Sequence, residues 1–209
     1  MKSLWIIACV LLLAGVATAQ EWIWYGGQMG VYFSETEFNP ATTNLDTSPG
    51  VPFYFYIVLR DAQVATVGGY ECSFEYVPAE VFVLAVIGRT EGFINFGTIQ
   101  NHLVGFGEPL PVDGNGDAVF CDVLNLYLGS DPVDLVMGPS DPSTGDPDHN
   151  PWGYTWNGPL IGDGIDPDIL LCCHLTSGAA GYPDVVATLN ALVVATESQT
   201  LTQVRRLFD

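Results

Sequence analysis

Basic residues are almost missing from this sequence. It has five lysines and arginines against 24 aspartates and glutamates, and its one lysine is Lys2. A surface with so little positive charge repels phosphate backbones and anionic lipid headgroups, so the composition argues against nucleic acid as a partner. Disorder does not explain the acidity, because 48% of the residues are hydrophobic and 12% are aromatic.

The sequence patterns of common hydrolases are also missing. There is no Gly-x-Ser-x-Gly nucleophile elbow and no His-Glu-x-x-His zinc helix, and the three histidines are scattered. Glu71 and Glu75 stand four apart on one predicted strand face, a spacing that suits a carboxylate pair but is equally typical of a solvated strand. We therefore expect a non-enzymatic protein, with a secreted hydrolase using an unrecognised carboxylate site as the second alternative.

The N-terminus has the pattern of a secretory signal. Lys2 precedes an apolar run over residues 4–16, and the small residues Ala17-Thr18-Ala19 follow. This pattern predicts a signal peptide over residues 1–19 and a mature chain from Gln20. No second apolar run approaches eighteen residues, so we expect no transmembrane segment in the mature chain. The predicted location is extracellular or at the cell surface, with the periplasm as an alternative.

Removal of Lys2 leaves four arginines against 24 acidic residues, a net charge of −20. Three explanations for such acidity stay open: solubility outside the cell, binding of divalent cations, or a salty habitat.

Four cysteines lie in the predicted mature chain: Cys72, Cys121, Cys172 and Cys173. In an exported protein we expect them to be oxidised. A bond between the adjacent Cys172 and Cys173 would be strained, so long-range bridges to Cys72 and Cys121 are favoured and the pairing stays open. A metal site is the rival interpretation, although there is no Cys-x-x-Cys spacing and His174 is the one nearby histidine.

The mature sequence is typical of strands and turns. Glycines and prolines, 23 and 14 in the whole chain, separate short runs rich in valine and aromatics. The residues from Tyr70 to Tyr76 alternate apolar and polar, which predicts a half-buried antiparallel strand. Val81 to Ile87 is apolar on both faces, which predicts a central strand or a short buried helix. We predict an all-β fold, an antiparallel β-sandwich over residues 20–195. The other predicted strands cover 29–33, 51–59, 118–128, 169–175 and 184–189.

Two segments depart from this pattern. Residues 138–168 are rich in proline and aspartate, and we expect a long acidic loop or insertion there. Residues 196–209 are predicted to form a short C-terminal tail helix. Its apolar face is Leu201, Val204, Leu207 and Phe208, with Arg205 and Arg206 in the last turn. This helix either docks on the domain or binds a receptor.

Several motifs carry a family resemblance. The segments Gly30-Val31-Tyr32-Phe33, Pro49-Gly50-Val51-Pro52-Phe53 and Gly68-Gly69-Tyr70-Glu71-Cys72-Ser73-Phe74, together with the basic tail, resemble a set of uncharacterised secreted bacterial β-sandwich proteins. Residues 28–130 also resemble a cohesin-type jelly roll, an Ig-like sandwich. In such a domain a Gly-Tyr-x-x-x-Phe-x-Tyr strand is followed by a proline, here Pro78, and an apolar strand.

Cohesin-type domains bind a partner protein across one sheet face. The resemblance therefore implies an extracellular binding, adhesion or structural module, with an extracellular protein or a polysaccharide as the partner.

Asp113, Asn115 and Asp117 form a candidate metal site. Their spacing at i, i+2 and i+4 matches the first ligands of a calcium loop, but Leu124 stands where such a loop carries glutamate. Asp-Gly-Asn-Gly is also an excellent hairpin turn. The sequence thus leaves two interpretations open, a turn alone or a turn that binds Ca²⁺.

Trp152, Tyr154 and Trp156 form a candidate carbohydrate site. On an extended segment these alternating aromatics share a face, which is a common way to hold sugar rings. The first alternative function is therefore a carbohydrate-binding module. The competing interpretation is that the three rings cover the sandwich or fix the long loop.

Overall fold

The computed structural model describes residues 25–78, 81–143, 156–166, 168–178 and 183–191. The elements in chain order are β1 (Tyr25–Tyr32), η1 (Pro40–Thr43), β2 (Asn44–Leu45), β3 (Pro52–Arg60), β4 (Thr66–Val77), β5 (Val81–Gly88), β6 (Ile94–Asn95), β7 (Asn101–Pro111), β8 (Ala118–Tyr127), β9 (Val133–Gly138), β10 (Leu160–Asp163), β11 (Leu170–Leu175) and β12 (Asp184–Leu189). The all-β prediction is confirmed for this part of the chain.

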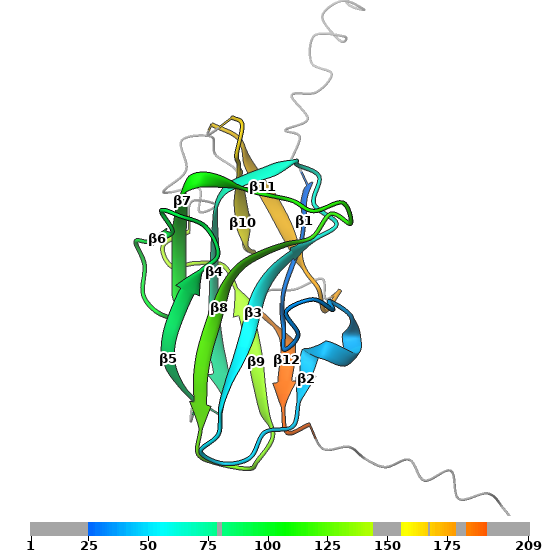
Figure 1. The fold of residues 1–209 in the computed structure, drawn as a ribbon, viewed down its shortest axis with the longest axis vertical. Coiled ribbons are helices and arrows are strands. Elements are labelled where there is room, and N and C mark those ends of the chain that lie inside the picture. The colour runs from blue at the N-terminus through cyan, green and yellow to red at the C-terminus, as the bar shows by residue number, and fades with distance from the viewer. Residues whose placement is uncertain (1–24, 79–80, 144–155, 167, 179–182, 192–209) are drawn as a thin grey trace, which may run out of the picture.

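The strands form two layers (Figure 1). One layer has the strand order β1-β3-β8-β5. In the other layer, β4 pairs with β7 on one side and with β9 on the other, and β12 follows β9. β10 and β11 lie between β4 and β1 in the hydrogen-bonded order and so connect the layers. β10 lies within residues 138–168, which the sequence predicted as a loop.

The sheet is mixed rather than antiparallel throughout. β1 pairs with β11 in parallel, and β2 pairs with β12 in parallel. In each pair the two strands are far apart in the sequence, which leaves ample chain for the crossover that parallel pairing needs. The prediction of a purely antiparallel sandwich is therefore corrected.

The core lies between the two layers. The predicted alternation of β4 is confirmed, because Tyr70, Cys72, Phe74 and Tyr76 are all buried. Phe74 meets Phe55 of β3 edge to face at 5.3 Å. Tyr70 stacks on Phe120 of β8 at 4.5 Å. Aromatic pairs of this kind add to the burial of apolar surface that stabilises the sandwich.

A buried polar network crosses this core. The Tyr70 hydroxyl lies 2.7 Å from Nδ1 of His102 and 3.2 Å from Sγ of Cys121. Nε2 of His102 lies 3.2 Å from the carbonyl oxygen of Ile99, so we assign the imidazole proton to Nε2. Nδ1 then accepts a hydrogen bond from the Tyr70 hydroxyl. Burial lowers the pKa of His102 to about 4, so the ring is neutral near pH 7.

The predicted disulfides are absent from the described region. Cys72, Cys121, Cys172 and Cys173 are all free and buried. The adjacent Cys172 and Cys173 point to opposite faces of β11, as neighbours in a strand must. The Cys121 sulfur contacts the Tyr70 hydroxyl, and burial raises the pKa of both Cys121 and Cys172 to about 12. Such thiols act as small apolar side chains rather than as reactive groups.

Gly69 lets β4 and β7 approach each other. A Cβ added at this position would lie 2.3 Å from the carbonyl oxygen of Val104. Gly69→Ala is therefore expected to push the strands apart and to destabilise the fold by about 1–3 kcal/mol, measured by denaturant unfolding. Gly114→Ala is the matched control, because an added Cβ there meets nothing within 4 Å. Equal stability of the two variants would contradict this account of the strand pair.

Several predictions fall on residues that the structure does not describe. These are the signal peptide at 1–19, the tail helix at 196–209 and the aromatic residues Trp152 and Tyr154. Among the described residues, no helix has the length and apolar character needed to cross a membrane.

Candidate functional site

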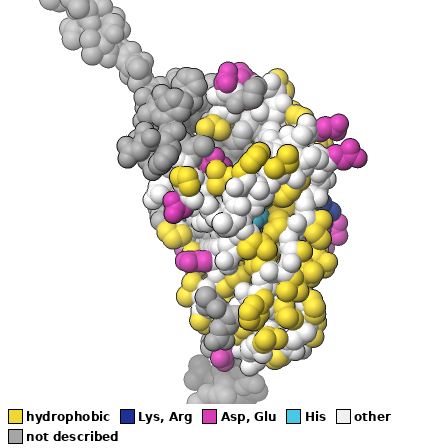
Figure 2. Space-filling view, turned by 90° about the vertical axis from the view of Figure 1, so that its left-hand side faces the viewer, with side chains coloured by type: hydrophobic (Ala, Val, Ile, Leu, Met, Phe, Trp, Pro, Cys, Tyr) yellow, Lys and Arg dark blue, Asp and Glu magenta, His cyan; other side chains and the backbone are white. Residues whose placement is uncertain are grey.

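The outward side of β3, β8 and β5 brings exposed apolar side chains from three neighbouring strands together. The strand register places Leu126 between Pro52 and Phe82, and Leu124 between Tyr54 and Ala85. We call this surface the open face, and its residues are Pro52, Tyr54, Phe82, Leu84, Ala85, Leu124 and Leu126. Figure 2 looks onto the side of the molecule that carries β5, and hydrophobic side chains spread over its lower right part.

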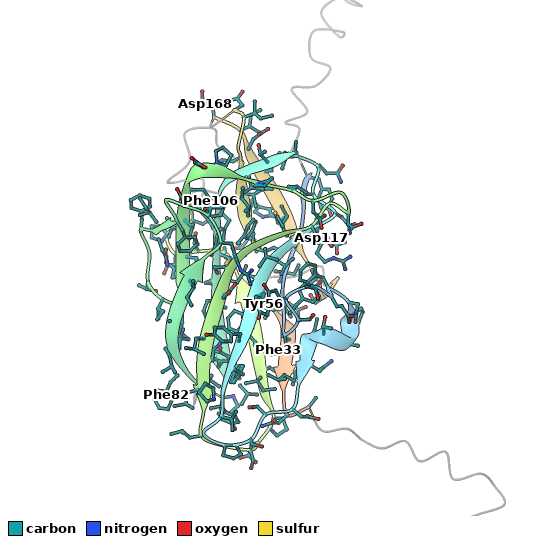
Figure 3. All side chains as sticks on the ribbon, in the orientation of Figure 1. Phe33, Tyr56, Phe82, Phe106, Asp117 and Asp168 are labelled. Carbon is teal, nitrogen blue, oxygen red and sulfur yellow. The ribbon has the colours of Figure 1, made fainter. Side chains whose placement is uncertain are left out.

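Large side chains of the open face are exposed to solvent. Phe82 is 55% exposed, Leu84 50% and Tyr54 42%. Figure 3 labels Phe82 near the lower end of β5 and Tyr56 farther up on β3. The inward neighbours on the same strands, such as Phe55 and Val123, are fully buried. Strand alternation thus fills the core with one set of apolar residues and leaves a second set outside, where it adds nothing to the core.

β5 borders the open face as an edge strand. It is the last strand of its layer and pairs only with β8 among the described strands. Its sequence, Val-Phe-Val-Leu-Ala-Val-Ile-Gly, contains no charge and no proline, the residues that usually protect such an edge from other chains. A bulge at Leu84 is the one irregularity in its pairing with β8. The prediction that this segment is a central strand or a buried helix is therefore wrong.

A charged cluster limits the open face at its upper end. The guanidinium of Arg89 bonds to Asp122 through Nε and to Glu35 through Nη1, the second contact measuring 2.8 Å. The same guanidinium lies over the Tyr56 ring, 5.5 Å from its centroid. Apolar residues bordered by charged ones form the usual anatomy of a protein-binding surface.

The candidate calcium residues form a hairpin turn. Asp113 accepts hydrogen bonds at Oδ1 from the backbone amides of Asn115, at 2.8 Å, and Asp117, at 2.9 Å. These bonds lower the pKa of Asp113. The carboxylate of Asp117 turns instead to Arg60, 3.3 Å from its Nε. The turn geometry is present, and calcium binding there stays a prediction.

Trp156 is the described member of the aromatic row. It is half-buried, its Nε1 donates to the carbonyl oxygen of Pro159 at 3.0 Å, and its ring meets His174 edge to face. These contacts fix Trp156 against β10 and β11. Carbohydrate binding by the row as a whole stays a prediction.

The candidate carboxylates of β4 differ in environment. Glu71 accepts a hydrogen bond from the Ser140 hydroxyl at 3.0 Å, whereas Glu75 is exposed. Within the described ranges, no cluster of three or more His, Cys, Asp or Glu side chains could hold a metal ion.

Comparison with solved structures finds cohesin modules. A cohesin from a family 33 glycoside hydrolase of Clostridium perfringens matches with a TM-score of 0.44 and 13% identity over 72% of this chain and 91% of that one. The sixth cohesin of Acetivibrio cellulolyticus scaffoldin B, solved in complex with the Cel5 dockerin, gives 0.48 and 10% over 79% and 98%. A cohesin from Clostridium acetobutylicum gives 0.37 and 15% over 74% and 94%.

These cohesin modules are what the chain is similar to in structure. The β-sandwich predicted from the sequence is confirmed by the strand order of the described residues. No protein-family model matches the sequence, and no curated protein matches it.

Sequence reasoning missed the open face. Phe82 and Leu84 lie in a run that was predicted to be a central strand or a buried helix, and Leu124 and Leu126 lie in a predicted strand whose faces were not assigned. One sequence signal could have found them: the chain has more apolar strand positions than a single core can bury.

Proposed function

We propose that the protein is a non-catalytic binding module that acts outside the cell and holds another protein chain on its open face. The observation that carries the proposal is the exposure of Tyr54, Phe82 and Leu84, at 42%, 55% and 50%. A soluble protein that keeps such residues together on its surface usually covers them with a partner. The extracellular location rests on the signal pattern of residues 1–19.

A protein partner fits the open face better than a polysaccharide does. The strand register gives the open face two rows of residues across the strands, Pro52-Leu126-Phe82 and Tyr54-Leu124-Ala85. These rows contain two aromatic side chains, several aliphatic ones and no charged residue. A sugar would need donors and acceptors for its hydroxyl groups, whereas an apolar protein surface needs only complementary shape. The bare edge of β5 can in addition pair with an extended segment of the partner.

The charge of the chain bears on how a partner arrives. A predicted mature chain with a net charge of −20 attracts basic proteins over long distances and repels acidic ones. Arg89 is tied to Asp122 and Glu35, so the border of the open face adds no free positive charge. With a basic partner we therefore expect association to slow as salt concentration rises, while the apolar contacts set the lifetime of the complex.

Phe82→Asp should weaken the complex by at least about tenfold, because a buried aromatic anchor commonly contributes 2 kcal/mol or more to binding. The matched control is Ile165→Asp, which alters a side chain that is 76% exposed in the connection from β10 to β11. Three columns would carry the wild-type protein and the two variants. The probes are culture fluid of the source organism, the purified Cel5 dockerin and a second copy of this chain.

A protein that binds the wild type and Ile165→Asp but is lost from Phe82→Asp supports the proposal. Its affinity for each variant is then measured by biolayer interferometry. The proposal fails if all three columns retain the same proteins, or if none retains any.

A further inference from the structure

A polar pocket opens where β1 and β12 separate. β12 is paired to β9 and β2 on its two sides, and β1 to β3 and β11, so no ladder joins β1 to β12. The resulting pocket has a volume of about 360 Å³. This is the size range of pockets that hold small ligands. It shares no residue with the open face.

The lining of the pocket is rich in hydrogen-bonding side chains. β1 supplies Gln28 and Tyr32, η1 supplies Thr43, the turn after β11 supplies Thr176, and β12 supplies Thr188. Hydroxyl and amide groups both donate and accept, so they suit a ligand that carries several hydroxyl groups. Val186 and Ala187 add a small apolar wall.

Arg60, at the end of β3, is the one charged residue among the described residues that line the pocket. Its Nε lies 3.3 Å from Oδ1 of Asp117, and the neighbouring buried Tyr32 also favours the charged form of the guanidinium. A guanidinium has five N–H donors in a planar fork, and these two contacts do not use them all. The fold therefore holds the guanidinium of Arg60 in place and leaves some of its N–H donors unused. A guanidinium in this arrangement can bind a carboxylate through paired hydrogen bonds. Figure 3 labels Asp117.

Thr176 gives a second, independent indication of a ligand. Its Oγ1 is buried and has no hydrogen-bond partner among the described residues. A buried hydroxyl without a partner costs stability, so its retention at a pocket calls for a group that completes it. Gly30 makes room for this side chain, because a Cβ there would lie 1.9 Å from Oγ1 of Thr176.

We propose that this pocket binds a small carboxylate that also carries hydroxyl groups, the chemical class of the sugar acids. The carboxylate pairs with the guanidinium of Arg60, and the hydroxyl groups of the ligand bond to the side chains of Gln28, Thr43 and Thr176. Binding here is independent of the protein complex on the open face.

Isothermal titration of the full chain with glucuronate, and with glucose as its neutral counterpart, tests the proposal. We expect saturable binding of glucuronate and at least about tenfold weaker binding of glucose, because a charge-assisted hydrogen bond contributes more than a neutral one. Arg60→Gln should remove the difference between the two sugars. Equal binding of both sugars to the wild type, or binding of neither, would overturn the proposal.

Thr176→Val separates ligand binding from folding. Valine has nearly the shape of threonine, and the hydroxyl that it removes has no partner in the fold. We expect the variant to melt no lower than the wild type and to bind glucuronate more weakly, by a factor of about five. A lower melting temperature with unchanged affinity would assign this hydroxyl to the fold and count against the pocket.

Discussion

Phe55→Ala is expected to lower the free energy of unfolding by about 3–5 kcal/mol, whereas Phe82→Ala is expected to lower it by no more than about 1 kcal/mol. Phe55 is fully buried and packs against Phe74 across the two layers. Its truncation leaves a cavity between the layers that the rigid strands cannot close. Phe82 belongs to the open face and is 55% exposed, so its truncation removes little buried contact.

Urea unfolding of the two variants and the wild type measures both values under one set of conditions. The comparison is informative because the same side chain is removed from the two sides of one layer. If Phe82→Ala cost as much as Phe55→Ala, the outer side of β5 would be part of a core. The proposal that this side is reserved for a partner would then lose its basis.

The second large effect concerns pH. His102 is buried and its pKa is lowered to about 4, whereas an unfolded histidine titrates near pH 6.5. Between these values the unfolded chain binds a proton that the folded chain does not. The contribution of the neutral ring is therefore fully present above about pH 6.5 and is lost as pH falls toward 4. The loss between pH 7.5 and pH 4.5 is expected to reach about 2–3 kcal/mol.

His102→Gln should remove this part of the pH dependence. The wild type and the variant are compared by chemical unfolding at pH 7.5 and at pH 4.5, and the variant should lose about 2–3 kcal/mol less stability between the two pH values. Phe74→Leu is the control, because it disturbs the same core without removing a titratable group and should keep the wild-type dependence. Parallel losses in the wild type and His102→Gln would show that the ring is not held neutral by the fold.

The alternation of β4 and the turns rich in glycine and proline were enough to predict an all-β sandwich. An extended strand places every second side chain on the same face, so an alternating segment can bury its apolar residues on one side of a sheet. Tyr70 to Tyr76 form such a strand. β7, β9 and β10 were not predicted. β7 contains Gly105, Gly107 and Pro109, which weaken the strand signal, while β9 and β10 are short and lie beside or within the proline-rich stretch.

Pairing information is what the sequence lacked. Whether Val81 to Ile87 is a central or an edge strand depends on its neighbours in the sheet, which no local pattern contains. For the same reason the parallel pairs of β1 and β2 were missed. The cysteines were interpreted from the compartment predicted for the chain, while their burial beside Tyr70 and within β11 was invisible in the sequence.

The candidate site was predicted only in its most general form. The cohesin resemblance implied contact across one sheet face, and the structure identifies an apolar face on β3, β8 and β5. Its residues could not be chosen from the sequence, because inward and outward apolar positions look alike when both alternate sets are hydrophobic. The pocket around Arg60 joins residues from five separate segments, so it exists only in the folded chain.

Hydroxyl-radical footprinting of the free folded protein is the most direct test of the open face. Mass spectrometry would compare oxidation of Tyr54, Phe82 and Leu84 with that of the buried Phe55 and Phe74. We expect rapid oxidation of the first three residues, slow oxidation of the last two, and protection of the first three once a protein is bound. Equally slow oxidation of both sets in the free protein would show that another part of the chain covers this surface, and would contradict the account.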